Sequence, residues 1–225
     1  MKASKELAAH AKQAKEGEGS RQDRALSIVE ALLLAMVAML AAWSGYSSAK
    51  WATASRLHLA QASTARTEAS RANLEANTEK NFDGSTFNAW FSAYVANNQQ
   101  AMDLAVKRFR PEFKVAFDAW IATSPATNPD APPGPTYMPE YVQPELQVAN
   151  DLDAKADALY AQGATEGGNA DDYVRTTVYL ATVLFMVGIS GHFRFKSARI
   201  GLIVVGGVIL MYAVYLLLQA PKPPG

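Results

Sequence analysis

Three long apolar stretches constrain this chain more than any other feature of its sequence. They run from Ala25 to about Trp43, from Tyr173 to Gly191 and from Ile200 to Leu218, and the third contains no charged side chain. A helix that crosses the hydrocarbon core of a bilayer needs roughly 20 mostly apolar residues. The sequence therefore predicts an all-α membrane protein with three transmembrane helices, at 25–47, 173–191 and 200–218.

A cleaved signal peptide is the alternative interpretation of the first stretch, because basic residues precede it and small residues follow it. The polar leader, 1–24, is long for a signal peptide, and Glu30 interrupts what would be its apolar core. We therefore favour a transmembrane helix that is retained in the mature protein.

The distribution of positive charge predicts the orientation. The leader holds six basic and four acidic residues, and the short link at 192–199 holds three basic residues and no acid. Cytoplasmic segments of membrane proteins carry such an excess of Lys and Arg. Three spans place the leader and the link on the same side, so we expect a cytoplasmic N-terminus. The segment 48–172, with ten basic and sixteen acidic residues, is then an extracytoplasmic domain, and 219–225 is an outer tail.

The predicted outer segment has the sequence pattern of a helical bundle. No helix breaker follows Gly45 for more than thirty residues, so the first helix is expected to extend outward as a rod and to end at Asn81–Ser85. Aromatic residues then recur at steps of three and four, and Pro111 suits the first turn of a further helix. The main aromatic positions are Phe87, Trp90, Phe91, Tyr94, Phe109, Phe113, Phe117 and Trp120. We expect them to form the bundle core; an aromatic ligand pocket is the alternative.

Proline dominates the segment 124–144, which holds seven of the eleven prolines of the chain. This loop is expected to be extended and non-helical. We favour a loop that wraps over its own bundle, and a polyproline surface for a partner is the alternative. A last outer helix, about 145–162, is expected to lead through a flexible segment, GATEGGNADD, into the second span.

Small residues offer two further packing signals. No repeat of fixed period is evident, but a weak stripe in the rod would allow close helix packing within one chain or between copies; it comprises Leu57, Ala60, Ala65, Ala72 and Ala76. Glycines in the second and third spans favour a tight antiparallel hairpin, although glycine is also common in membrane helices. These glycines are Gly188, Gly191, Gly201, Gly206 and Gly207.

Residues that carry out chemistry are sparse. The chain has no cysteine, and its three histidines lie in separate segments, so no zinc or thiol site is expected. Asp151, Asp153 and Asp157 do not fit a calcium loop, because Lys155 takes a ligand position and Ala156 replaces the turn glycine; a solvated acidic face is expected there. Phosphate-binding and serine-nucleophile motifs are also missing. Equal numbers of basic and acidic residues argue against nucleic-acid binding. We expect no enzyme activity and no cofactor.

Glu30 is the one ionisable residue well inside a predicted span. A carboxylate at that depth costs a few kcal/mol unless it is paired, protonated or wetted. The predicted topology places basic residues of the link at the same level. The sequence thus predicts an intramembrane polar site made of Glu30, His192, Arg194 and Arg199. An ion pair is the favoured interpretation, and an ion or proton path is the alternative.

Three segments resemble a family of bacterial membrane proteins of unknown function. They read WSGYSSAKW at Trp43–Trp51, RFRPEFKVAFDAW at Arg108–Trp120 and NPDAPPGPTYMPEY at Asn128–Tyr141. The resemblance covers most of the chain after the leader. It implies a bacterial plasma membrane and a helical outer domain between spans, and it supplies no catalytic or binding residue.

These patterns lead to two hypotheses about function. The first is a non-enzymatic protein of the lipid bilayer whose outer domain mediates assembly, either as a homo-oligomer or as an accessory subunit of a membrane complex. The second is an oligomeric channel or transport component in which Glu30 lines an ion or proton path.

Overall fold

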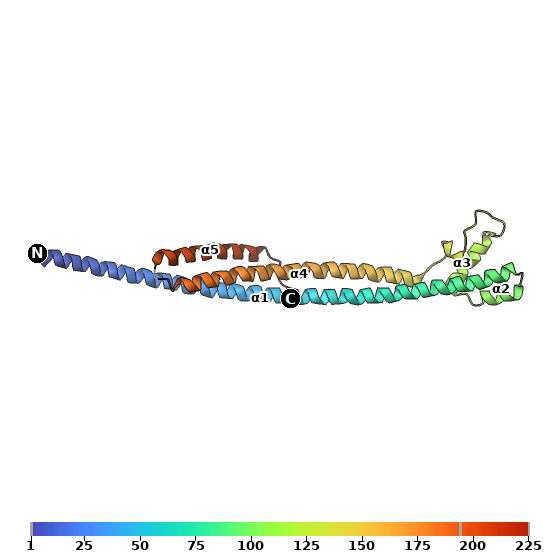
Figure 1. Ribbon diagram of the computed structural model, residues 1–225, viewed down its shortest axis with the longest axis horizontal. Helices are drawn as coiled ribbons and strands as arrows, with labels where there is room; N and C mark the ends of the chain where they lie inside the picture. Colours follow the sequence, from blue (N-terminus) through green and yellow to red (C-terminus); the bar gives the residue numbers. More distant parts are fainter. Residues whose placement is uncertain (1, 194, 225) are drawn as a thin grey trace. The chain divides into compact units, whose positions relative to one another are not determined.

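The structure is a computed structural model that describes the backbone of residues 2–193 and 195–224, with side chains from residue 24 onward. Its helices are α1 (Lys2–Val95), α2 (Gln99–Val106), α3 (Pro111–Ala122), the 3₁₀ turn η1 (Pro135–Tyr137), α4 (Pro144–Ser190) and α5 (Lys196–Gln219) (Figure 1). The described residues include no strand, so the all-α prediction is confirmed.

The chain forms two compact units, which are described separately. The apolar unit comprises Met1–Leu57 and Gln162–Gly225, and the aromatic unit comprises His58–Ala161. Three described helices, α1, α4 and α5, hold stretches long and apolar enough to cross a membrane, as predicted. Large apolar side chains cover the outer faces of these stretches, including Leu32, Met39 and Phe185. Such faces are typical of helices that contact lipid, and the fold is that of a multi-pass membrane protein.

Aliphatic side chains from all three helices form the core of the apolar unit. Its buried members are Val37, Leu180, Val183, Val187, Leu210 and Ala213. A Cβ atom at Gly206 of α5 would lie 3.3 Å from Val187 Cγ2 on α4, so glycine permits the close approach there. At Gly188, Gly201 and Gly207 a Cβ would meet nothing within 4 Å. One glycine of the predicted set therefore brings α4 and α5 together.

Serine side chains join α1 to α4 within the apolar unit. The Ser44 hydroxyl donates to the Tyr173 carbonyl at 2.9 Å, and the Ser55 hydroxyl donates to the Gly163 carbonyl at 2.7 Å. As the residue number rises along α1, its partner's number falls along α4, so the two helices are antiparallel. A Cβ at Gly167 would lie 3.3 Å from Ser55 Oγ.

The prediction that the segment GATEGGNADD is flexible is wrong, because this segment is helical and belongs to α4. Glycine is unfavourable in an isolated helix, but here Gly163 and Gly167 face Ser55 of α1 at close range. Packing against a neighbouring helix outweighs the weak propensity of these residues.

In the aromatic unit, buried alanines follow a seven-residue repeat. Those on α1 alternate in steps of three and four: Ala62, Ala65, Ala69, Ala72 and Ala76. Ala149 and Ala156 of α4 are also buried and lie seven residues apart. This spacing keeps one face of a helix against its partner, as in a coiled coil. The predicted stripe is confirmed in part: Ala65, Ala72 and Ala76 belong to this buried face, whereas Leu57 and Ala60 are exposed. The seven-residue spacing of the alanines was not predicted.

An ion pair accompanies this alanine face. Arg66 of α1 donates to Asp153 at 3.3 Å and to Asp157 at 2.7 Å, and both carboxylates belong to α4. Asp153 and Asp157 remain 55% and 70% exposed, as expected for a solvated acidic face, and they also take part in the helix pairing.

The end of α1 lies beyond the predicted turn at Asn81–Ser85. Asp83 points into the aromatic unit, where it pairs with Arg110. The helix ends instead at Val95, and Asn97 takes a left-handed conformation with φ of 52°. The Asn98 side chain then caps α2 by accepting from Ala101 N at 3.0 Å. Pro111 occupies the first turn of α3, as predicted.

We predict that Ala65→Leu lowers the free energy of unfolding by about 1–3 kcal/mol, because a larger side chain overpacks the buried repeat. Ala60→Leu is the matched control, since Ala60 is exposed on the same helix. Thermal unfolding in detergent, followed by circular dichroism, measures both. Equal stability of the two variants would contradict the packing described here.

Candidate functional site

The apolar unit contains an ion pair between Glu30 of α1 and Arg199 of α5. Arg199 Nε lies 2.7 Å from Glu30 Oε1, and its Nη2 lies 2.5 Å from Oε2. The Ser190 hydroxyl, at the end of α4, donates to Oε1 at 2.7 Å, and Arg199 Nη2 also donates to Ser27 Oγ at 3.2 Å. The two charged side chains are only 12% and 15% exposed. Both carboxylate oxygens therefore have donors, in the bidentate geometry that Arg favours.

The structure brings together two of the four residues predicted for this site. His192 lies in the turn between α4 and α5 with an exposed side chain, and in the described part of the chain it makes no bond to Glu30. Arg194 lies outside the described residues. Ser27 and Ser190 complete the site and were missed; a hydroxyl one helical turn before Glu30 was the available signal for Ser27.

Replacing one member of the ion pair should lower the free energy of unfolding by more than expected from its share of the loss in a variant that lacks both members. Glu30→Gln or Arg199→Gln leaves one partly buried charge without its partner, and each is expected to lower the free energy of unfolding by about 3 kcal/mol. The double variant Glu30→Gln/Arg199→Gln should cost clearly less than the sum of the two. Thermal unfolding in detergent measures the cycle, and strictly additive losses would show that the two side chains do not interact.

A second charged network lies in the aromatic unit, around the fully buried carboxylate of Asp83. Arg110 donates to it through Nε at 3.1 Å and Nη2 at 3.2 Å, and the Tyr141 hydroxyl donates to Oδ2 at 3.0 Å. Arg110 Nη1 also pairs with Glu79 Oε1 at 2.8 Å. Hydrogen bonding to Asp83 raises the pKa of the Arg110 guanidinium. The network ties α1 to the start of α3 and to the loop that precedes α4.

Tyr141 makes this network sensitive to high pH. Burial, followed by its hydrogen bond to Asp83, raises the pKa of the Tyr141 hydroxyl well above its usual range. Above about pH 10, a tyrosine in the unfolded chain ionises while folded Tyr141 stays protonated. The unfolded state then binds fewer protons than the folded state, so stability falls as pH rises.

We therefore predict that the unfolding free energy of the wild type declines more steeply above about pH 10 than that of Tyr141→Phe. Tyr160→Phe, which alters an exposed hydroxyl in the same unit, should keep the wild-type decline. Chemical unfolding in detergent at a series of pH values measures the slopes, and identical slopes for all three proteins would refute the assignment.

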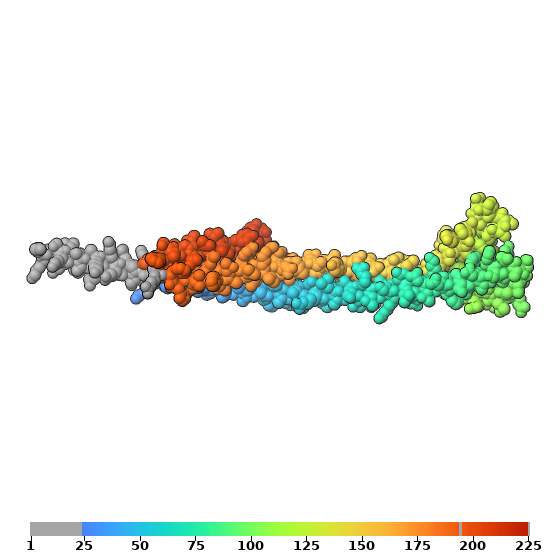
Figure 2. Space-filling view, in the orientation of Figure 1, coloured from blue at the N-terminus to red at the C-terminus, as the bar shows by residue number. Residues whose placement is uncertain are grey.

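Aromatic rings form the core of the aromatic unit, as the sequence predicted. The buried members are Trp90, Phe109, Phe113, Phe117 and Trp120, joined by Ala105. Many rings meet edge to face, as do Trp90 and Phe117 with centroids 4.9 Å apart. The proline-rich loop packs on this cluster: the Trp120 indole donates to the Pro132 carbonyl at 2.8 Å, and Tyr141 contacts Phe113. Figure 2 shows α3 and the loop in yellow-green beside the green end of α1.

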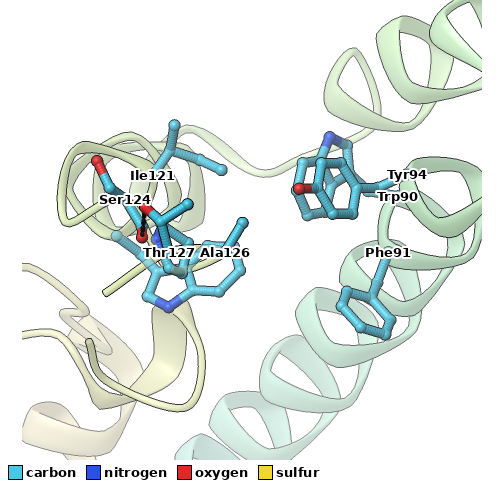
Figure 3. Close-up of a pocket in the computed structure, with 9 residues that line it drawn as sticks. Trp90, Phe91, Tyr94, Ile121, Ser124, Ala126 and Thr127 are labelled. Carbon is cyan, nitrogen blue, oxygen red and sulfur yellow. Dashed lines mark hydrogen bonds between the residues drawn. The ribbon is translucent and has the colours of Figure 1, made fainter. Parts of the chain in front are cut away.

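A cleft of about 300 Å³ opens beside this core (Figure 3). Trp90 and Tyr94 of α1 form one wall, with rings stacked at a centroid distance of 5.3 Å and an angle of 15°. The end of α3 and the turn that follows it form the other wall. The complete lining is Trp90, Phe91, Tyr94, Trp120, Ile121, Ser124, Pro125, Ala126 and Thr127. The aromatic residues thus form a core, as the favoured interpretation predicted, and Trp90, Phe91, Tyr94 and Trp120 also line this cleft.

The second wall of the cleft is a rigid turn. Ser124 takes a φ of 54°, which is uncommon for a residue other than glycine. The amides of Thr127 and Asn128 both donate to the Ser124 carbonyl at 3.0 Å, and the Asn128 side chain donates to the Thr123 carbonyl at 3.0 Å. These bonds hold the strained conformation, so the cleft is formed before anything binds.

The cleft is lined by aromatic rings and a few hydroxyl groups. Its polar side chains are the hydroxyls of Tyr94, Ser124 and Thr127, and its lining contains no charged residue. Among residues whose side chains are described, no group of three or more His, Asp or Glu is placed to hold a metal ion. The site offers rings and hydroxyl donors to a ligand rather than an acid, a base or an activated nucleophile.

Comparisons of the chain with known protein families, with curated proteins and with solved structures find no match. Its function is therefore inferred from its own residues and geometry.

Proposed function

We propose that the chain is a non-enzymatic, multi-pass protein of the bacterial plasma membrane that serves as an assembly or accessory subunit. In this proposal its N-terminus is cytoplasmic, and the aromatic unit is extracytoplasmic and docks another protein. The observation that carries the proposal is the preformed aromatic cleft between α1 and the turn after α3.

The surface of the cleft has the composition of a protein interface. Phe91, Tyr94 and Ile121 line it and remain 48%, 42% and 40% exposed. Aromatic side chains are enriched in interfaces, and anchors that fill such pockets supply much of the binding energy. A volume of about 300 Å³ is at the lower limit of pockets for small molecules. It suits one or two side chains of a partner.

The charge pattern supports the proposed orientation. All of the aromatic unit falls within the acidic segment 48–172, whereas basic residues dominate the leader and the link at 192–199. The choice of a bacterial plasma membrane rests only on the resemblance of three short segments, because no family model matches the chain.

A channel or transport function, with Glu30 in an ion or proton path, is the alternative. Such a path requires a carboxylate that is open to water or to a moving proton. Arg199 and Ser190 already bond both oxygens of Glu30, which favours a structural role.

The topology is testable because the chain contains no cysteine of its own. We predict that, in intact cells, an impermeant thiol reagent labels Ser85→Cys and does not label Ser197→Cys. Both positions are exposed in the structure, so accessibility across the membrane decides the result. Permeabilised cells, in which both cysteines should react, are the control. Labelling of position 197 in intact cells would show that the orientation is wrong.

The docking role predicts a specific photo-crosslink. Benzoylphenylalanine in place of Phe91, inside the cleft, should give a discrete adduct with another protein in intact cells. The same residue in place of Tyr160, which is 60% exposed in the same unit and outside the cleft, should not. Gel shift and mass spectrometry identify the adduct. Failure of position 91 to form any adduct above the level of position 160 would overturn the proposal.

A further inference from the structure

We propose that a pocket formed by α4, α5 and the C-terminal tail binds the headgroup of a phospholipid, with its phosphate at Arg175 and a primary amine at Asp172. The pocket has a volume of about 200 Å³. This volume is below the range of pockets for drug-sized ligands and suits a headgroup. All of its residues belong to the apolar unit, so the inference does not depend on the docking function proposed for the cleft.

The pocket lies where the apolar stretches of all three long helices end. The Ser44 hydroxyl, just beyond the stretch of α1, donates to the carbonyl of Tyr173, where the stretch of α4 begins. The Tyr173 hydroxyl donates in turn to the Pro221 carbonyl, just beyond the stretch of α5, at 2.9 Å. Tyr212 and Tyr215, in the last third of α5, are exposed. Tyrosines gather in this way where a membrane protein meets the lipid headgroups.

The polar wall of the pocket is a pair of opposite charges. Arg175 Nη2 lies 2.9 Å from Asp172 Oδ1, one turn away on α4, and the two side chains are 59% and 55% exposed. A guanidinium has five N–H donors and a carboxylate has two acceptor oxygens, so this bond leaves both groups able to bind a ligand. The Gln219 amide, which donates to the Tyr215 hydroxyl at 2.6 Å, adds a polar group from α5.

Neighbouring charges of opposite sign favour a ligand that also carries both charges. A phosphate forms strong charge-assisted hydrogen bonds with an arginine, and a primary ammonium forms them with a carboxylate. An anionic lipid without an amine would bring its phosphate close to Asp172. A quaternary ammonium has no N–H to donate to that carboxylate. Phosphatidylethanolamine, which combines a phosphate with a primary amine, satisfies both side chains.

The apolar side of the pocket indicates a lipid rather than a free phosphate ester. Leu216 lines the pocket, and about one turn farther into the apolar stretches Tyr179 of α4 meets Tyr212 of α5 edge to face, with ring centroids 5.6 Å apart. Val178 and Met211, in the same turns of the two helices, are exposed. Acyl chains that extend from a headgroup in the pocket would lie along these apolar side chains.

Native mass spectrometry of the full chain in detergent tests the inference. The protein is titrated with dioleoyl phosphatidylethanolamine, phosphatidylcholine and phosphatidylglycerol. We expect the ethanolamine lipid to bind about fivefold more tightly than the other two, because it alone pairs with both side chains. Glycerophosphoethanolamine, which is the same headgroup without acyl chains, should bind at least about tenfold more weakly than the lipid.

Two variants assign the charges within the pocket. Arg175→Gln should weaken binding of all three lipids about tenfold, because each loses its phosphate partner. Asp172→Asn should abolish the preference for the ethanolamine lipid over the choline lipid and leave binding of the choline lipid intact. Asp118→Asn is the matched control, since Asp118 is a 57% exposed carboxylate of α3 paired with Lys114 outside the pocket. A preference is a ratio within one sample, so partial unfolding does not imitate its loss.

Several results would overturn the inference. Equal binding of the three lipids to the wild type would indicate general association with the apolar surface, and tighter binding of phosphatidylglycerol would show that Asp172 selects no amine. A preference that survives in Asp172→Asn would place the ethanolamine lipid elsewhere. Glycerophosphoethanolamine that binds as tightly as the lipid would make the ligand a soluble phosphate ester. None of these results bears on the crosslink at position 91, which tests the docking function separately.

Discussion

Close packing of α1 against α4 through small side chains is the constraint on which the rest of the structure depends. In the aromatic unit the contact face is built from alanine at a seven-residue spacing, and in the apolar unit from serine facing glycine. Small residues allow two helix backbones to approach closely, and they gain dispersion contacts rather than large apolar burial.

Polar contacts then specify which residues meet. Alanine faces alone tolerate a shift in register, but Ser55 has one carbonyl partner on α4, and Arg66 has two carboxylates there. The buried Asp83 network fixes α3 and the proline-rich loop on α1. The cleft proposed as the docking site is a consequence of that arrangement, because its two walls come from α1 and from the turn after α3.

Features with a strong periodic or compositional signal could be predicted, including the three apolar helices, the aromatic core and the start of α3 at Pro111. The ends of α1 and the continuity of α4 could not, because they depend on partners distant in sequence. Gly163 reads as a flexible residue until Ser55 is known to face it, and Asn81–Ser85 reads as a turn until Asp83 is known to pair with Arg110. Three members of the alanine face were predicted, but Ala62 and Ala69 were missed because alanine is a weak hydrophobic signal. Glu30 was identified from its cost in a membrane, but its specific partner required the structure.

The pairing of α1 with α4 is tested most directly by a designed disulfide, for which the cysteine-free chain gives no background. Ser55 Oγ lies 3.3 Å from the position of a Cβ at Gly167, which is close enough for two cysteines to bond. Gly168, the adjacent residue, would place its Cβ near nothing within 4 Å. Under mild oxidation, Ser55→Cys/Gly167→Cys should form an intramolecular disulfide rapidly, and Ser55→Cys/Gly168→Cys should not. Equal reaction of the two pairs, or reaction at 168 alone, would contradict the helix pairing described here.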